Sequence, residues 1–338
     1  MKHYTQLLKN YAWTLILVLP LLVFSSACSS DDDPIVTPTV NEAELLVQQL
    51  EGANGDYLNT AAAAIVPAVD VYADVTGAKK FYLIDVRAAA DYALGHVAGA
   101  HNVLIADVLT HMKTVNVANY DKIIVICYTG QSAAWTTAML RMSGYTTAFS
   151  MKYGMTSWHS DFDRLSSKVK SDRLGDFVTT ASPAKPAVGA LPTLSTGKTT
   201  GAEILADRIA AIHAEGYSPS AIDAATVFGT PDQYFIVNYW PEADYLNLGH
   251  IPGSYQYTPK ADLKLATFLK TLPTNKTVVV YCYTGQTSAN VAAILRVMGY
   301  DAKSLSYGTN GLIWQRMKDN AKTAFDATVD CKNFAYEK

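Results

Sequence analysis

The amino-acid sequence predicts an α/β protein made of two tandem copies of one domain, each a mainly parallel sheet with helices on both faces. Short apolar runs of β type alternate with helical patterns, which is typical of a parallel sheet covered on both sides. The segment "IIVICYTGQSA" recurs later as "VVVYCYTGQTS", and its flanking stretches recur in the same order. With 338 residues, 49% of them hydrophobic, the chain can fill two domain cores.

The charge of the chain argues against one class of partner. The formal net charge is -3, and Lys and Arg form no stripe along the sequence. A nucleic-acid-binding surface needs such a basic stripe to neutralise phosphates. We therefore expect no nucleic acid among the partners.

Residues 1–27 are predicted to be a signal peptide. Lys2 and Lys9 give a positively charged start, and "WTLILVLPLLVF" is an apolar run too short to span a bilayer. The segment ends in "SSAC", and small residues directly before Cys28 resemble a bacterial lipoprotein signal, although Ser25 stands where an aliphatic residue is usual. The resemblance implies cleavage before Cys28 and lipidation of this cysteine. A plain secretory signal is the alternative.

The predicted lipid would anchor the protein to a membrane in the cell envelope of a Gram-negative bacterium, through a tether over residues 28–44. The tether contains "SSDDDP", which resembles the acidic sorting signal of lipoproteins exposed on the outer membrane surface. A short Asp run is also common in a solvated linker. The pattern therefore leaves two alternative locations, the periplasm and the outer surface of the outer membrane.

The internal repeat sets the expected domain boundaries. Domain 1 is expected over residues 45–175 and domain 2 over residues 201–330, followed by a C-terminal tail over residues 331–338. Residues 176–200 are expected to be a linker, because "TTASPAKPAVGALPTLSTGKTTG" is rich in Pro, Gly, Ser and Thr and has no hydrophobic period.

Each domain contains the same succession of strand and helix patterns. The strand runs are "FYLIDV" and "KIIVIC" in domain 1, and "YFIVN" and "TVVVYC" in domain 2. The helical runs "SAAWTTAMLRMSG" and "TSANVAAILRVMG" follow them and stop at Gly144 and Gly299. A glycine at this place is typical of a helix C-terminal cap.

Each copy places a cysteine, Cys127 or Cys282, between an apolar strand and the start of a helix. The thiol is therefore expected at the C-terminal edge of the sheet, where ligands of open α/β folds bind. The positive end of the helix dipole, with its unpaired N–H groups, favours an anion such as a thiolate there. Gly130 and Gly285 let the backbone curl its amides around the sulfur.

Together these motifs resemble rhodanese, the sulfurtransferase family. The resemblance covers nearly the whole mature chain and rests on the cysteine loop, the segments "GHVAGA" and "GHIPGS", the "DVR" that ends a strand of domain 1, and a downstream "GY" followed by Gly and Trp. It implies an enzyme whose nucleophiles Cys127 and Cys282 take sulfane sulfur from a donor, hold it as a persulfide and pass it to a thiol-type acceptor. The loop residues that it implies for substrate binding are Tyr128, Thr129, Gly130, Gln131 and Ser132, and Tyr283, Thr284, Gly285, Gln286 and Thr287.

The loops depart from the family pattern in charge. Many active members carry an arginine five residues after the cysteine, where this chain has Ser132 and Thr287. A loop without a cation attracts thiosulfate, a doubly anionic donor, only weakly. Polysulfide or a persulfide is therefore expected as the donor ahead of thiosulfate.

The two copies also differ behind the loop. Asp85 and Arg87 of the "DVR" segment are expected to support the first loop, and domain 2 replaces them with Asn238 and Trp240. If the acid and the base matter, the first site should be the faster. A non-catalytic binding or scaffold lipoprotein and a thiol-redox protein remain the alternatives to a sulfurtransferase or sulfane-sulfur carrier.

Other residues receive simpler interpretations. His96 and His250 are expected to hold their turns by hydrogen bonds rather than to act as bases. Cys331 has no predicted role. His and Cys show no metal-ligand spacing and there is no glycine-rich nucleotide loop, so we expect neither a metal nor a cofactor.

Overall fold

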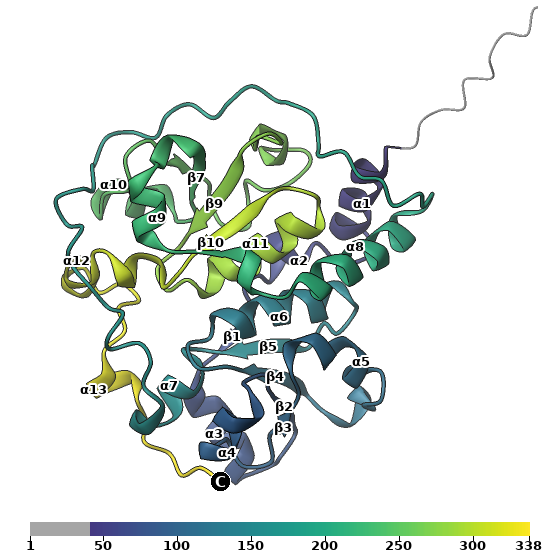
Figure 1. The fold of residues 1–338 in the computed structure, drawn as a ribbon, viewed down its shortest axis with the longest axis vertical. Helices are drawn as coiled ribbons and strands as arrows, with labels where there is room; N and C mark the ends of the chain where they lie inside the picture. Colours follow the sequence, from purple (N-terminus) through teal and green to yellow (C-terminus); the bar gives the residue numbers. More distant parts are fainter. Residues whose placement is uncertain (1–40) are drawn as a thin grey trace, which may run out of the picture. The chain divides into compact units, whose positions relative to one another are not determined.

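The fold consists of two parallel sheets of the same topology (Figure 1). The computed structural model describes residues 41–338, which lie within one compact unit. The strand order is β1-β5-β4-β2-β3 in the first sheet and β6-β10-β9-β7-β8 in the second. This identity of order confirms the predicted tandem α/β fold.

The strands are short, and their residues are buried almost continuously, as expected for a parallel sheet covered on both faces. The first sheet contains β1 (Ile65–Val66), β2 (Phe81–Asp85), β3 (His101–Asn102), β4 (Lys122–Ile126) and β5 (Ala148–Met151). The second contains β6 (Ala221–Ile222), β7 (Tyr234–Asn238), β8 (Tyr255–Gln256), β9 (Thr277–Tyr281) and β10 (Ala302–Leu305). The strands that precede the cysteines, β4 and β9, are therefore the central ones.

Helices connect the strands and cover the sheets. In the first half they are α1 (Glu42–Glu51), α2 (Tyr57–Thr60), α3 (Ala68–Thr76), α4 (Ala89–Leu94), α5 (Val108–Met112), α6 (Gln131–Met142) and α7 (Gly154–Trp158). In the second half they are α8 (Gly201–Glu215), α9 (Ala224–Gly229), α10 (Glu242–Asn247), α11 (Gln286–Val297), α12 (Trp314–Asp319) and α13 (Ala327–Asp330). Short 3-10 turns lie at Ile105–Asp107, Val117–Asn119, Ser160–Phe162, Ser218–Ser220, Pro231–Gln233, Leu269–Thr271 and Gly308–Gly311.

The helices that follow the cysteines end where the sequence predicts. After α6, Gly144 has φ +96°, and after α11, Gly299 has φ +102°. The Tyr145 N–H donates back to the Leu140 carbonyl at 3.0 Å, which closes the C-terminal cap. Only glycine adopts such a backbone without strain, so these positions fix both helix ends.

Helices α6 and α11 pack against each other and join the two halves. Trp135 and Met139 of α6 are fully buried in a hydrophobic cluster that also contains Val291 of α11 and Val280 of the second sheet. The Asn290 side chain donates to the Ala134 carbonyl at 3.0 Å across this contact. Both helices are buried nearly all round, in keeping with their small and apolar residues.

The ends of the described chain cross to the opposite half. Helix α1 packs on α8, with Leu46 and Leu50 in the same cluster as Ile204. From the other direction, the Phe334 N–H donates to the Trp158 carbonyl at 3.0 Å, so the C-terminal tail lies along α7. Each half is therefore held by a segment of the other.

Most predictions for the N-terminal segment concern residues that the structure does not describe. The proposed signal peptide, Cys28 and most of the tether fall outside the described residues. Among residues 41–338, the structure has no helix both long and apolar enough to cross a bilayer.

Candidate active site

The two thiols occupy equivalent places at the carboxyl ends of the central strands. Cys127 directly follows β4 and Cys282 directly follows β9, and each is four residues before its helix, α6 or α11. Their exposed fractions are 4% and 2%. Both thiols are free, as is Cys331. The thiols therefore lie at the C-terminal edge of each sheet, as predicted from the sequence.

Backbone amides converge on the first sulfur. The N–H groups of Gly130 and Ala133 lie 3.1 Å and 3.4 Å from Cys127 Sγ. Gly130 has φ +84°, which turns the backbone around the sulfur at the N-terminus of α6. Such a nest of N–H groups at a helix start favours negative charge on the sulfur.

The second sulfur is contacted by one backbone N–H group and by one hydroxyl. The Ser288 N–H lies 3.3 Å from Cys282 Sγ, and the thiol donates to Ser288 Oγ at 3.5 Å. Ser288 Oγ is 2.7 Å from Ser304 Oγ. Domain 1 has Ala133 in place of Ser288, so this hydroxyl pair is particular to the second site.

A turn after the next strand holds each cysteine from behind. The Met155 N–H donates to the Cys127 carbonyl at 2.7 Å, and the Thr309 N–H donates to the Cys282 carbonyl at 3.0 Å. A Cβ on Gly154 would lie 2.1 Å from the Cys127 carbonyl oxygen, and one on Gly308 would lie 2.3 Å from that of Cys282. The glycine that follows the downstream "GY" segment in each copy is therefore needed for this close approach.

The two loops hold each other through exchanged glutamine side chains. Gln131 Oε1 accepts a hydrogen bond from the Tyr307 N–H at 2.8 Å, and Gln286 Oε1 accepts one from the Tyr153 N–H at 2.9 Å. Gln286 Nε2 also lies 3.3 Å from the Gly130 carbonyl, to which it donates. Each glutamine thus bonds the turn behind the cysteine of the other domain.

Comparison with known proteins decides the family. The model of the rhodanese-like domain matches twice, at residues 68–161 and 226–313, and the two matches cover more than half of the chain. The chain belongs to the rhodanese family.

Relatives of this rhodanese protein include named sulfurtransferases. The adenylyltransferase and sulfurtransferase uba4 of Ogataea parapolymorpha is 32% identical over 82 residues, which cover 24% of this chain and 21% of that protein. The thiosulfate sulfurtransferase GlpE of Pseudomonas fluorescens is 28% identical over 87 residues, which cover 24% of this chain and 72% of that protein. The crystal structure of SseA from Escherichia coli, described as a 3-mercaptopyruvate sulfotransferase, matches 74% of this chain and 99% of its own at 16% identity, with a TM-score of 0.27.

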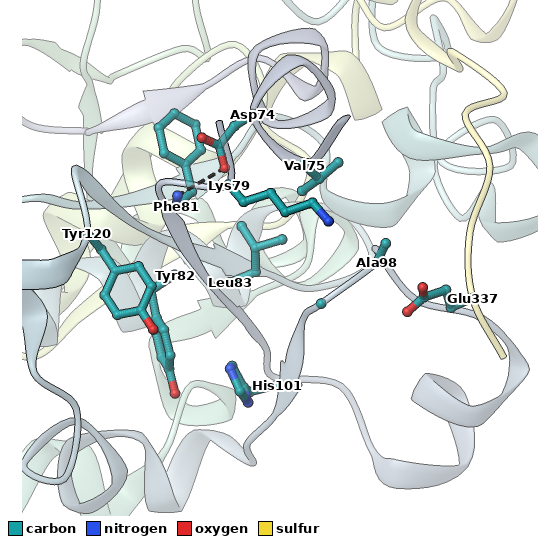
Figure 2. A pocket seen from close by; sticks show the side chains of 11 residues that line it. Asp74, Val75, Lys79, Phe81, Tyr82, Leu83, Ala98, His101, Tyr120 and Glu337 are labelled. Carbon is teal, nitrogen blue, oxygen red and sulfur yellow. Dashed lines mark hydrogen bonds between the residues drawn. The ribbon is translucent and has the colours of Figure 1, made fainter. Parts of the chain in front are cut away.

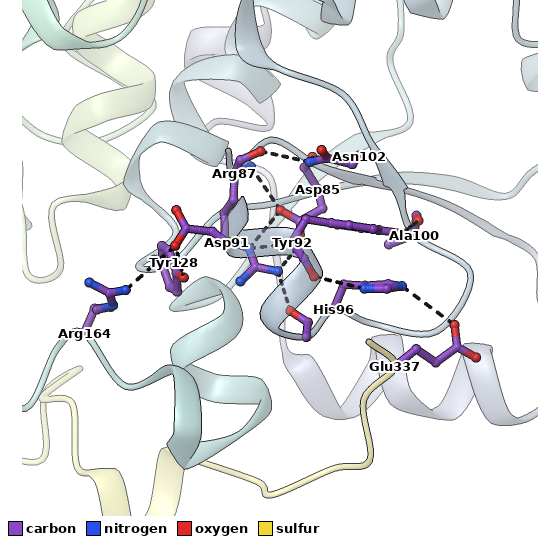
Figure 3. Close-up of polar contacts among 11 residues, drawn as sticks. Asp85, Arg87, Asp91, Tyr92, His96, Ala100, Asn102, Tyr128, Arg164 and Glu337 are labelled. Carbon is purple, nitrogen blue, oxygen red and sulfur yellow. Dashed lines mark hydrogen bonds and ion pairs between the residues drawn. The ribbon is translucent and has the colours of Figure 1, made fainter. Parts of the chain in front are cut away.

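Behind the loop of the first rhodanese domain lies a buried ion pair. Arg87 Nη2 is 2.6 Å from Asp85 Oδ2 and also donates to the Gly95 carbonyl at 2.7 Å (Figure 3). The guanidinium lies 4.9 Å from the centre of the Tyr128 ring. The pair therefore connects the loop tyrosine to the "GHVAGA" turn.

The second rhodanese domain replaces this ion pair with aromatic groups. Trp240, which stands where domain 1 has Arg87, stacks on Tyr283 with 4.7 Å between ring centres. Tyr281, in place of Ile126, accepts a hydrogen bond from the Ile251 N–H at 3.2 Å and so contacts the "GHIPGS" turn. Asn238 is fully buried beside them.

Each loop tyrosine has a carboxylate and a cation beside it, although the loop has no cation. The Tyr128 hydroxyl donates to Asp91 at 2.7 Å, and Arg164 lies 4.4 Å from the centre of the Tyr128 ring (Figure 3). In domain 2 the Tyr283 hydroxyl donates to Asp244, and Lys322 Nζ is 2.6 Å from the same carboxylate. Burial and the hydrogen bond to Asp244 raise the pKa of Tyr283.

Sequence reasoning missed these cations because they come from segments that the repeat does not align. Arg164 follows α7, and Lys322 follows α12. An aspartate is paired with each of these cations, so the positive charge that each cation adds to its site is partly neutralised.

In each loop the threonine bonds to the glutamine of the same loop. Thr129 Oγ1 accepts from the Gln131 side chain at 3.1 Å, and Thr284 Oγ1 accepts from the Gln286 N–H at 3.2 Å. Ser132 and Thr287, the last of the predicted substrate-binding residues, are only half-buried.

The two histidines hold their turns, as predicted. His96 Nδ1 lies 3.1 Å from the Tyr92 carbonyl, and His250 Nδ1 lies 3.2 Å from the Tyr245 carbonyl. Each imidazole also stacks on the ring of that tyrosine. Among residues 41–338, neither imidazole has a hydrogen bond to a cysteine.

Other features lie apart from the thiols. A cavity of about 440 Å³ in domain 1 is lined by Tyr82, His101, Tyr120 and Glu337 among others, and by neither cysteine (Figure 2). Residues 41–338 contain no cluster of three His, Cys, Asp or Glu side chains that could hold a metal ion.

Proposed function

We propose that this rhodanese protein is a sulfurtransferase that carries sulfane sulfur as persulfides on Cys127 and Cys282 and passes it to a thiol acceptor. The observation that carries the proposal is the presence of backbone N–H groups beside each Sγ at a helix start: those of Gly130 and Ala133 lie 3.1 Å and 3.4 Å from Cys127 Sγ, and that of Ser288 lies 3.3 Å from Cys282 Sγ. These amides are placed to stabilise a sulfur anion at a helix start. The sulfurtransferase names of the relatives support sulfur transfer as the activity of the family.

The proposed step is a nucleophilic exchange at sulfur. The cysteine thiolate attacks the outer sulfur of a persulfide or polysulfide, a new S–S bond forms at Sγ, and the bond to the donor breaks. The electron pair leaves with the donor as its thiolate, so the exchange needs no external oxidant. A thiol acceptor then takes the outer sulfur by the same reaction in reverse.

Polysulfide and persulfide donors suit the site better than thiosulfate does. Ser132 and Thr287 supply no charge at the position where an arginine would hold a second anionic group. Arg164 and Lys322 lie beside the loop tyrosines, but carboxylates already partly neutralise them. Thiosulfate, the donor in the name of the GlpE relative, is the weaker candidate here.

Intact-mass measurement tests the proposal. The protein is incubated with polysulfide and freed of excess donor, and its mass is compared with that of Cys127→Ala, Cys282→Ala and the double variant. We expect one added sulfur on each single variant and none on the double variant. No added sulfur on the unaltered protein would leave a scaffold or thiol-redox role instead.

We also propose that the protein acts in the cell envelope, anchored through lipid on Cys28. The support is the "SSAC" signal and the charged start of the chain. Cell fractionation of the unaltered protein and of Cys28→Ala tests this: the first should be found with membranes and the second should be released. Equal distribution of both would contradict the anchor.

A further inference from the structure

Two buried serines lie beside the second cysteine. Ser288, in the first turn of α11, and Ser304 of β10 are both fully buried, and their Oγ atoms are 2.7 Å apart. The Cys282 thiol donates to Ser288 Oγ at 3.5 Å. The three side chains therefore form one continuous chain of hydrogen bonds that ends on the proposed nucleophile.

The other end of this chain is the Gly285 carbonyl. Each serine hydroxyl lies 3.3 Å from its oxygen, which also accepts a hydrogen bond from the Ala289 N–H at 3.1 Å. The carbonyl therefore keeps a donor when either hydroxyl turns away from it. Because a hydroxyl hydrogen rotates to suit its partners, each serine can donate or accept without moving its oxygen.

The direction of the chain depends on the charge of the sulfur. A thiol donates to Ser288 Oγ, which is the arrangement in the structure. A thiolate can only accept, so Ser288 then donates to the sulfur and Ser304 donates to Ser288. Every buried hydroxyl has a partner in both arrangements, so the reversal leaves no polar group unsatisfied.

The first sulfur obtains its donors in a different way. The N–H groups of Gly130 and Ala133 both donate to Cys127 Sγ. In the part of the chain that the structure describes, the Ser288 N–H is the only backbone group with a hydrogen bond to Cys282 Sγ. The Ser288 hydroxyl is therefore the group that can give the second sulfur its second donor.

Domain 1 contains only half of the serine pair. Ala133 stands at the place of Ser288, and the strand register puts Ser150 at the place of Ser304. The Ser150 hydroxyl is fully buried and donates to the Ala64 carbonyl at 3.4 Å. The two domains therefore provide a natural pair of sites with and without the hydroxyl beside the sulfur.

We infer that Ser288 is a catalytic residue of the second site, whose hydroxyl donates a hydrogen bond to the thiolate of Cys282 and is positioned for this by Ser304. The inference rests on the proposed persulfide chemistry. Before loading, the thiol gives its proton to water and Ser288 stabilises the thiolate that remains. When an acceptor thiolate attacks the outer sulfur, the bond from that sulfur to Sγ breaks, and the electron pair returns to Sγ. Ser288 keeps its proton throughout and stabilises the thiolate that leaves.

The pH profile of alkylation tests the hydrogen bond. The rate of reaction with iodoacetamide is followed at Cys127 and Cys282 separately, by mass spectrometry of the peptides that carry them. For Ser288→Ala we expect the midpoint of the Cys282 profile to move upward by about one pH unit or more, the effect of one lost hydrogen bond to a charged group. Ala133→Ser, which completes the pair in domain 1, should move the Cys127 profile downward. Ser150→Ala is the control and should move it by less than about 0.3 unit, a twofold change.

The rate of sulfur release tests the catalytic role. The Cys127→Ala protein, with and without Ser288→Ala, is loaded with polysulfide and freed of excess donor. It is then mixed with 2-mercaptoethanol, and the loss of the added mass is followed. We expect Ser288→Ala to slow release about threefold, because a less stable thiolate is a poorer leaving group and only part of its charge has developed in the transition state.

The outcomes separate this inference from the proposed function. An unchanged alkylation profile in Ser288→Ala would overturn the role of Ser288, and sulfur loading of the unaltered protein would leave the sulfurtransferase proposal standing. A shifted profile with no sulfur loaded on either cysteine would support the hydrogen bond and overturn the persulfide chemistry. If thermal unfolding shows that Ser288→Ala has lost its fold, Ala133→Ser decides instead: a Cys127 profile that does not move downward would overturn the inference.

Discussion

Gln286 Oε1 accepts a hydrogen bond from the Tyr153 N–H at 2.9 Å, so a side chain of the second cysteine loop fixes the turn behind the first cysteine. Gln131 makes the reciprocal bond to the Tyr307 N–H. The backbone groups joined in this way are buried or half-buried, where an unsatisfied N–H is costly. The two sites are therefore parts of one packed unit.

Replacing these glutamines should destabilise the protein unequally. Gln286→Ala removes bonds to the Tyr153 N–H and to the Gly130 and Met151 carbonyls, whereas Gln131→Ala removes one bond to domain 2. We expect Gln286→Ala to lower the free energy of unfolding by about 1 to 3 kcal/mol and Gln131→Ala to lower it by less. Urea unfolding measures both values. A larger loss for Gln131→Ala would contradict the bond pattern.

A methyl group on Gly154 should damage the first site. It would lie 2.1 Å from the Cys127 carbonyl oxygen, at a residue with φ +55°. We expect Gly154→Ala to cost about 3 kcal/mol of stability, by displacing a packed backbone, and to slow sulfur loading of Cys127. Gly175→Ala is the control, since a Cβ there meets no atom within 4 Å. Equal effects of the two substitutions would show that the contact does not matter.

The fold and the cysteine loops could be predicted because their signals are local. The strand runs, the glycines that end the helices and the loop glycines each determine the structure of only a few neighbouring residues. Each of these patterns also occurs twice, because the domain is repeated. The exchange of Gln131 and Gln286 could not be predicted. It depends on the packing of α6 against α11, which no short stretch of sequence encodes.

The replacement of Arg87 by Trp240 shows the same limit. In the sequence it indicates a lost support for the second loop. In the structure Trp240 stacks on Tyr283. Tyr281, at the end of β9, accepts a hydrogen bond from Ile251 in the "GHIPGS" turn. A compensation shared between two distant residues is visible only once both are placed.

Introducing a cation into the loop should shift donor preference. Ser132→Arg places a guanidinium at the end of the first loop, where it can hold the second charged end of thiosulfate. We expect loading of Cys127 from thiosulfate to rise about tenfold relative to loading from polysulfide, since one charge-assisted contact contributes roughly 1.5 to 3 kcal/mol. Ser132→Gln, similar in reach but neutral, is the control. An equal gain from both donors would show that loop charge does not select the donor.

Cys331 should make stability depend on pH in the alkaline range. Burial, followed by the charges of Asp163 and Asp330, raises the pKa of its thiol from 9.0 to about 11. The folded state holds the proton more strongly, so this contribution to stability is complete below 9.0 and is lost as the pH rises through about 11. We expect the unaltered protein to lose roughly 2 kcal/mol more than Cys331→Ala over this range, as measured by urea unfolding. Parallel losses in both proteins would contradict the burial of this thiol.

Breaking the ion pair of domain 1 should be costly. Arg87→Leu leaves the Asp85 carboxylate buried without its partner and removes the hydrogen bond to the Gly95 carbonyl. We expect a loss of about 3 to 5 kcal/mol in the free energy of unfolding, as is usual when one member of a buried pair is removed. Trp240→Leu in domain 2 is the comparison, because it removes packing without leaving a buried charge.

The arrangement of domain 2 should restore much of this loss when it is transplanted. The register places Asp85 beside Ile126 in domain 1 and Asn238 beside Tyr281 in domain 2, so the positions correspond one to one. In the triple variant Asp85→Asn, Arg87→Trp, Ile126→Tyr, the new indole can stack on Tyr128, and the new hydroxyl can bond the upstream turn. A buried ion pair can be exchanged for well-packed aromatic groups at little net cost, because the exchange also removes the desolvation penalty of two charges. We therefore expect the triple variant to be more stable than Arg87→Leu and to load sulfur on Cys127; a triple variant less stable than Arg87→Leu would mean that the two domains do not support their loops in equivalent ways.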